Sequence, residues 1–134
     1  MSYHKLVYFL AFLLFTLTLS AQDILMNNMN NNSTFNQCSG TFFDSGGAGA
    51  NYSSSENFTL TICPDMPDMR VVLEFIAFEI IATDDTLTIY DADTADPAEI
   101  IDTFTGDLTD ADNAVLNNIT ASDANLTGCL TFEF

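Results

Sequence analysis

The feature that most constrains this chain is a series of short segments in which apolar and polar residues alternate, separated by Gly, Asp, Asn and Pro. No stretch keeps the 3.6-residue apolar period of an amphipathic helix, and a period of two is typical of half-buried strands. The pattern predicts strands over residues 41–43, 57–62, 70–78, 86–90, 99–105, 114–119 and 128–134. Short strands at such intervals indicate an all-β sandwich or barrel.

Three of these segments show which face should be buried, because successive side chains of a strand point to opposite sides. The segment 70–78 is the strongest predicted strand, and Glu74 must emerge on its exposed face. The predicted core-facing sets are Phe58, Leu60 and Ile62; Val71, Leu73 and Phe75; and Leu130, Phe132 and Phe134.

The first 21 residues read as a signal peptide. Lys5 precedes an uncharged and almost wholly apolar segment, residues 6–19, and Ser20 and Ala21 supply the small residues that signal peptidase requires. The apolar segment is shorter than the roughly 20 residues that span a bilayer. We therefore expect cleavage after Ala21 and a secreted or cell-surface product; the alternative is an uncleaved membrane anchor.

Residues 22–37 are dominated by Asn and show no apolar period. Such a composition buries too little surface to offset the entropy of ordering the chain. We expect a flexible leader over 22–37 and a folded domain over 38–134.

The charge balance excludes whole classes of ligand. The chain carries 2 basic and 19 acidic residues, for a net charge of −17. Because Lys5 leaves with the signal peptide, the exported part carries 1 − 19 = −18. Nucleic acid is excluded because basic residues that neutralise phosphates are missing, and no membrane insertion is expected after cleavage. A basic partner is compatible with this charge, as is a merely solubilising role.

Catalytic residues are scarce in the exported part. The only histidine, His4, lies in the signal peptide, so no imidazole is left for a Ser-His or Cys-His pair or for a catalytic zinc site. A pair of carboxylates could in principle hydrolyse glycosides. We expect no enzymatic activity.

Three cysteines, Cys38, Cys63 and Cys129, lie in a chain expected to reach an oxidising compartment. Three is an odd number, so either one thiol stays free or its partner lies outside this chain.

The order of several short motifs resembles a CUB domain, and more narrowly the CUB-like modules of secreted bacterial proteins. The motifs are C-S-G-T-F-F-D-S-G-G at 38–47, N-Y-S-S-S-E-N at 51–57, T-I-C-P at 61–64 and G-C-L-T-F at 128–132. The resemblance implies a jelly-roll β-sandwich with a Cys38–Cys63 disulfide. It also implies a further C-terminal strand, so that 38–134 would be a truncated domain with Cys129 unpaired.

Many CUB domains bind Ca²⁺ between loops, and part of that ligand set has counterparts here. Asp85 matches the Asp before the L-x-I strand, and Glu56 falls where the first ligand is expected. The resemblance therefore implies a Ca²⁺ site that includes Glu56, Asp84 and Asp85; the alternative is that these are solvated loop residues. Asp91, Asp93 and Asp96 form another acidic group, which we interpret as turn-forming.

These features together predict a non-catalytic extracellular module that mediates protein or cell-surface interactions or adhesion, assisted by Ca²⁺ if the site forms. A carbohydrate-binding jelly roll is the alternative, although the chain has no Trp for a sugar platform. A ligand-free structural spacer of a larger secreted protein is the third reading. Tyr52 and Tyr90 are candidates for exposed recognition aromatics or for core packing.

Overall fold

The computed structural model describes residues 21–80, 85–107, 109 and 111–134, except for the side chains at 111, 112, 114 and 117. The predicted signal peptide lies outside this part of the chain apart from Ala21. Among the described residues, no helix is long and apolar enough to cross a membrane.

Strands and turns make up nearly all of the structure, which confirms the predicted all-β class. The strands are β1 (Ile24–Leu25), β2 (Ser33–Asn36), β3 (Phe42–Phe43), β4 (Thr59–Cys63), β5 (Val72–Leu73), β6 (Glu79–Ile80), β7 (Leu87–Tyr90), β8 (Ile100–Phe104), β9 (Gly106–Asp107), β10 (Ile119–Thr120) and β11 (Leu130–Glu133). Three 3₁₀ segments, Gly47–Gly49, Pro97–Glu99 and Ala111–Asn118, connect them.

The largest sheet has five strands in the order β2-β4-β11-β7-β8. The last strand in sequence, β11, lies at its centre and pairs antiparallel with both β4 and β7. Leu130 lies opposite Ile62, and Phe132 lies opposite Leu60. The backbone pairing continues past the strand, because Phe58 and Phe134 exchange two hydrogen bonds of 3.0 and 2.9 Å.

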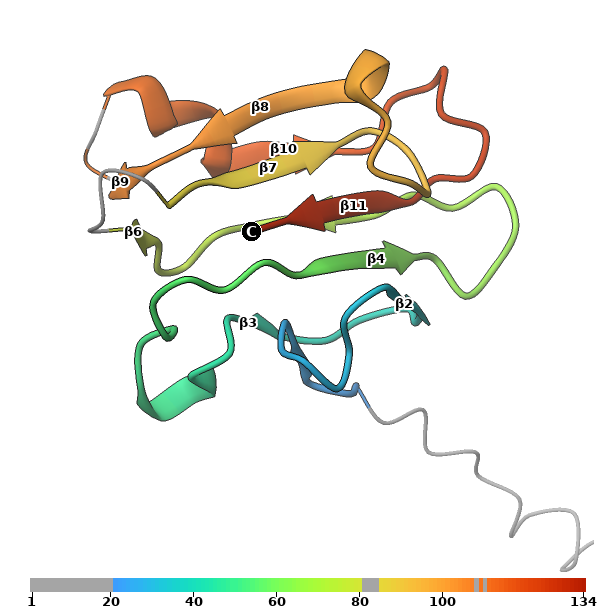
Figure 1. Ribbon diagram of the computed structural model, residues 1–134. Helices are drawn as coiled ribbons and strands as arrows, with labels where there is room; N and C mark the ends of the chain where they lie inside the picture. Colours follow the sequence, from blue (N-terminus) through green and yellow to red (C-terminus); the bar gives the residue numbers. More distant parts are fainter. Residues whose placement is uncertain (1–20, 81–84, 108, 110) are drawn as a thin grey trace, which may run out of the picture.

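Three two-stranded sheets, β1-β3, β10-β5 and β6-β9, complete a sandwich-like arrangement. Figure 1 shows β4, β11, β7 and β8 side by side, with β10 behind them. The core lies between the layers and contains Leu60, Ile89, Phe104, Leu116 and Phe132, each at most 1% exposed. The predicted core-facing residues belong to this core or pack against it, whereas Glu74 is exposed.

The expectation of a flexible leader over 22–37 is wrong. Ile24 and Met26 are buried in the core, and β2 pairs in parallel with β4 over four residues. Asparagine side chains supply much of the local order: Asn31 Oδ1 accepts from Thr59 N at 2.9 Å, and Asn30 Nδ2 donates to Leu25 O at 2.8 Å. The folded unit therefore begins before Cys38.

Two predicted strands are also corrected. The segment 70–78 contains only the two-residue β5, although it was the strongest prediction. The segment 114–119 is mostly the 3₁₀ helix Ala111–Asn118, followed by β10. Asn113 is buried in that helix and donates to Thr105 O and Asp107 O at 2.7 and 2.8 Å, which favours a helical turn over an extended chain.

The disulfide joins Cys63 to Cys129, and Cys38 is free and exposed. The predicted Cys38–Cys63 pair and the unpaired Cys129 are therefore both wrong. The register that places Leu130 opposite Ile62 also places Cys129 opposite Cys63, at the end of β4. The bond thus fastens the central pair of strands together.

The outer face of this central pair is covered by the turn that follows β7. Thr61 and Thr131 are buried there and share a hydrogen bond of 2.8 Å. Thr131 Oγ1 also donates to Ala92 O at 2.9 Å.

The acidic residues of this turn accept hydrogen bonds from nearby backbone and side-chain groups. Asp91 accepts from Ser122 N and from Asn125 Nδ2. Burial raises the pKa of Asp91, but hydrogen bonds from the side chain and backbone of Ser122 and from Asn125, together with the charge of Arg70, outweigh burial and hold the pKa below its ordinary value. The predicted turn-forming role is confirmed for Asp96, which accepts from Ala98 N.

Replacing both Cys63 and Cys129 with Ser should lower the free energy of unfolding by about 4 kcal/mol, because the bond closes a loop with a sequence separation of 66 residues. Urea unfolding monitored by circular dichroism measures this change. Cys38→Ser is the matched control and should change stability little, since its thiol is exposed. A Cys38–Cys63 peptide in a non-reducing digest would contradict the assignment.

Candidate functional site

A groove runs between the segment that contains β3 and the segment from residue 69 to 80. It consists of two hollows, with volumes of about 620 and 380 Å³. Both hollows are lined by Thr41, Phe42, Phe75, Ile76 and Ala77, so they form one continuous depression. These volumes fall in the range of ordinary ligand-binding clefts.

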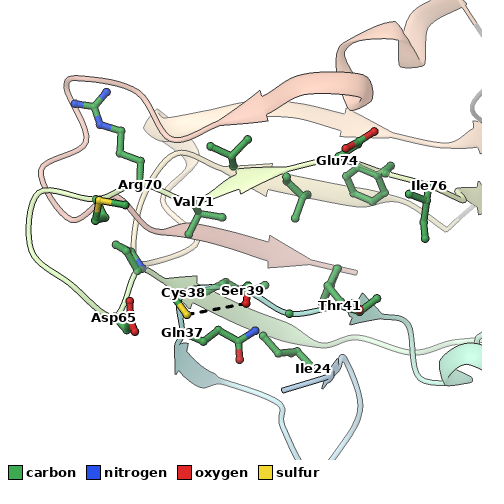
Figure 2. A pocket seen from close by; sticks show the side chains of 18 of the residues that line it. Ile24, Gln37, Cys38, Ser39, Thr41, Asp65, Arg70, Val71, Glu74 and Ile76 are labelled. Atoms are coloured by element: carbon green, nitrogen blue, oxygen red, sulfur yellow. Dashed lines mark hydrogen bonds between the residues drawn. The ribbon is translucent and has the colours of Figure 1, made fainter. Parts of the chain in front are cut away.

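The first hollow lies at the Cys38 end of the groove. Figure 2 shows Cys38, Ser39 and Thr41 on one side of it and Val71, Glu74 and Ile76 on the other. Ile24 and Ile62 contribute core side chains to its lining. The second hollow continues to Ser45, Glu56 and Phe134 at the opposite end.

The groove concentrates apolar surface that is exposed to solvent. Eight large apolar side chains are exposed among the residues with described side chains, and four of them, Met66, Met69, Val72 and Ile76, line the first hollow. Ile76 is 84% exposed. Exposed apolar side chains gathered around one hollow mark interaction sites on soluble proteins more often than scattered single residues do.

Carboxylates surround this apolar lining. Asp65 and Glu74 line the first hollow, and Asp44, Glu56 and Glu79 line the second. Arg70 is the sole basic residue after residue 21, and its guanidinium donates to the exposed carboxylate of Asp123. The groove therefore presents mostly negative charge.

The wall that carries Val72 is hydrogen-bonded to the residue that precedes Cys129 of the disulfide. Val71 N donates to Gly128 O at 2.9 Å, and Gly128 directly precedes Cys129. Gly128 has a φ of 66°, and a Cβ there would lie 2.2 Å from Met69 O. Only glycine allows this close approach between the two segments.

The predicted Ca²⁺ ligands are not gathered into a site within the part of the chain that the structure describes. Ser45 Oγ donates to both carboxylate oxygens of Glu56, at 2.7 and 2.6 Å. Asp84 lies outside the described residues. No group of three or more acidic, Cys or His residues that could hold a metal occurs in the residues searched. The Ca²⁺ site stays a prediction.

The two candidate recognition aromatics have packing roles. Tyr52 packs edge-on against Phe134, with ring centroids 4.8 Å apart. Tyr90 is 5% exposed, and its hydroxyl donates to the Glu133 carboxylate. This hydrogen bond, burial and the negative charge of Glu133 raise the pKa of Tyr90 from 10.0 to about 12. The interpretation of Tyr90 as an exposed aromatic is wrong.

Sequence reasoning missed the groove. The alternation in residues 70–78 predicts one buried face and one exposed face. However, Val72 and Ile76 on the exposed face are also large and apolar. A strand that is apolar on both faces is the signal that could have indicated a second contact surface.

No family model, no curated protein and no solved structure matches this chain.

The Tyr90–Glu133 contact predicts how stability responds to alkaline pH. A raised pKa in the folded state means that the protonated phenol stabilises the fold, and this contribution is lost as the pH rises from about 10 to about 12. We expect the free energy of unfolding to fall in that window. Tyr90→Phe should remove this pH dependence. Urea titrations at each pH test it, and an identical decline in both proteins would contradict the assignment.

Proposed function

We propose that this chain is a non-catalytic, secreted or cell-surface binding module of the CUB type, which engages a polypeptide partner through the groove between β3 and β5. The observation that carries the proposal is the concentration of four exposed large apolar side chains along one groove. Aliphatic and Met side chains flanked by polar groups are typical of protein-binding surfaces.

The CUB assignment is supported by the ordered motifs and by the sandwich-like layers of an all-β chain. The Cys63–Cys129 disulfide departs from the expected pairing. We therefore propose a CUB-type jelly roll in which the disulfide joins the central strands β4 and β11 instead of the first two strands.

The charge of the groove supports a basic partner. Five carboxylates line it, and the single guanidinium is already paired with Asp123. Complementary charge speeds association and selects against acidic partners. Nucleic acids and anionic lipids are disfavoured for the same reason.

A non-catalytic role is supported by the absence of histidine from residues 21–134 and by the apolar character of the groove. A carbohydrate-binding platform would require exposed aromatic rings. Tyr90 is buried and Tyr52 packs on Phe134, so neither supports that alternative.

Removing an exposed apolar side chain from the groove should weaken partner binding. We expect Ile76→Ser to weaken binders selected from a displayed library of peptides and protein domains by at least tenfold, because the apolar surface that a partner would cover is lost without any change of charge. Leu126→Ser is the matched control, since Leu126 is 97% exposed and does not line the groove. Biolayer interferometry measures the affinities, and circular dichroism confirms that both variants fold.

Two results would overturn the proposed function. One is a selection that yields only binders that are indifferent to Ile76→Ser. The other is binding to a glycan array without any protein or peptide binder.

Calcium assistance follows from the family resemblance alone. We expect calorimetry to show Ca²⁺ binding in the 10⁻⁴ to 10⁻³ M range typical of extracellular modules, and Asp85→Ala to abolish it. Asp102→Ala, on β8, is the control and should leave the heat unchanged. Absence of binding heat, or equal heats in all three proteins, would reject the site without affecting the groove.

A further inference from the structure

Each wall of the groove is a strand edge, and each has backbone groups without a hydrogen-bond partner among the residues that the structure describes. On one side, β3 pairs in parallel with β1: Ile24 N donates to Thr41 O at 2.8 Å, and Met26 N donates to Phe43 O at 2.9 Å. Because bonding directions alternate along a strand, the N–H and C=O of Phe42 point away from β1. Phe42 lines both hollows of the groove.

On the opposite wall, which contains β5, backbone groups also point away from the paired strand. Ala121 N donates to Val71 O at 3.0 Å, and β5 continues this antiparallel ladder with Leu73 opposite Ile119. The N–H and C=O of Val72 therefore point away from β10. Residues 74–78 make no backbone hydrogen bond within the part of the chain that the structure describes. Unpaired edges of this kind are templates for another strand.

The two walls run in the same direction. The Cys38 end of the groove is lined by residues 37–42 on one wall and 69–77 on the other. The opposite end is lined by residues 41–45 and 75–80. Residue numbers increase on both walls from the Cys38 end toward the opposite end. A single strand placed between the walls can therefore run antiparallel to both. Antiparallel pairing is slightly more stable per residue than parallel pairing.

We infer that the groove binds its partner by β-strand addition, in which one extended segment of the partner lies between β3 and β5 and joins the two sheets. This inference rests on the proposed function and specifies its mode. Main-chain hydrogen bonds to Phe42 and Val72 hold the segment, and pockets for alternate side chains give specificity. A segment of about five or six residues suffices, since that is the common strand length.

The side chains that line the groove define the chemistry of this segment. Alternate residues face the apolar lining made by Ile24, Ile62 and Phe75 and should be β-branched or aromatic. The intervening residues face outward, where Asp65, Glu74 and Glu79 provide negative charge, and should be Lys or Arg. The partner is therefore a strand of alternating apolar and basic residues.

A second copy of this chain does not meet these requirements. Residues 22–134 carry 1 − 19 = −18 charges, so two copies repel each other. The only basic residue of that part, Arg70, is engaged with Asp123. A partner of opposite charge is favoured instead.

Three synthetic peptides of equal length test the inference: one of alternating Val and Lys, one with the same residues in two blocks, and one of alternating Val and Glu. We expect the alternating Val-Lys peptide to bind at least tenfold more tightly than the other two. Hydrogen exchange should slow at Phe42, Val72 and residues 74–78. The free thiol of Cys38 provides a second measurement, because a bound strand should slow its alkylation.

Orientation gives a sharper criterion. A strand antiparallel to both walls ends with its C-terminus at Cys38, so a peptide with an activated disulfide on a C-terminal Cys should exchange with the Cys38 thiol faster than one with an N-terminal Cys. Cys38→Ser should abolish both reactions. Equal rates, or a faster N-terminal peptide, would contradict the antiparallel arrangement.

The outcomes separate the binding mode from the proposed function. If the alternating and block Val-Lys peptides bind equally, the contact is merely electrostatic and strand addition is overturned. If library binders are weakened by Ile76→Ser but do not slow exchange at Phe42 and Val72, the groove binds in another mode and strand addition is overturned. Concentration-dependent dimerisation of the free chain that protects the same amides would assign the groove to a second copy and overturn the inference.

Discussion

The antiparallel pairing of β4 with β11 is the contact on which the other elements depend. It joins residues 59–62 to residues 130–133 and brings four buried side chains together: Leu60, Ile62, Leu130 and Phe132. β2 is held in the sheet through β4, and β7 and β8 are held through β11. Because the two strands are far apart in sequence, closing the chain between them costs entropy. The Cys63–Cys129 bond offsets that cost by restricting the unfolded chain.

The same contact positions the groove. Cys129 fixes Gly128, Gly128 O accepts from Val71 N, and the wall from Val71 to Ala77 starts at that point. On the other wall, Gln37 N donates to Cys63 O at 3.1 Å. Both walls are thus attached to the two ends of one disulfide. A groove fixed in this way is preorganised at its Cys38 end, which would reduce the entropic cost of binding for the proposed partner.

Alternation in the sequence predicted the all-β class and the buried faces of 57–62 and 128–134, because the side-chain period of a strand is fixed by backbone geometry. It could not predict which strands pair or in which register, and the disulfide depends on both. The Asn-rich segment was misinterpreted because composition says nothing of hydrogen bonds to distant strands, such as that from Thr59 N to Asn31 Oδ1. The groove likewise depends on the arrangement of β3 and β5, which share no local pattern in the sequence.

The segment 70–78 shows a conflict between local preference and observed pairing. Its Val, Leu, Phe and Ile residues have high β propensity, yet only Val72 and Leu73 form a strand, and residues 74–78 have no backbone hydrogen bond among the described residues. Their side chains still pack on the core, since Phe75 contacts Phe78 with ring centroids 5.7 Å apart. The core-facing side chains of this segment are therefore packed, while the backbone groups of residues 74–78 have no hydrogen-bond partner among the described residues. A mismatch between local sequence preference and observed pairing is expected at functional sites. Pairing with one additional strand would remove this mismatch in residues 74–78.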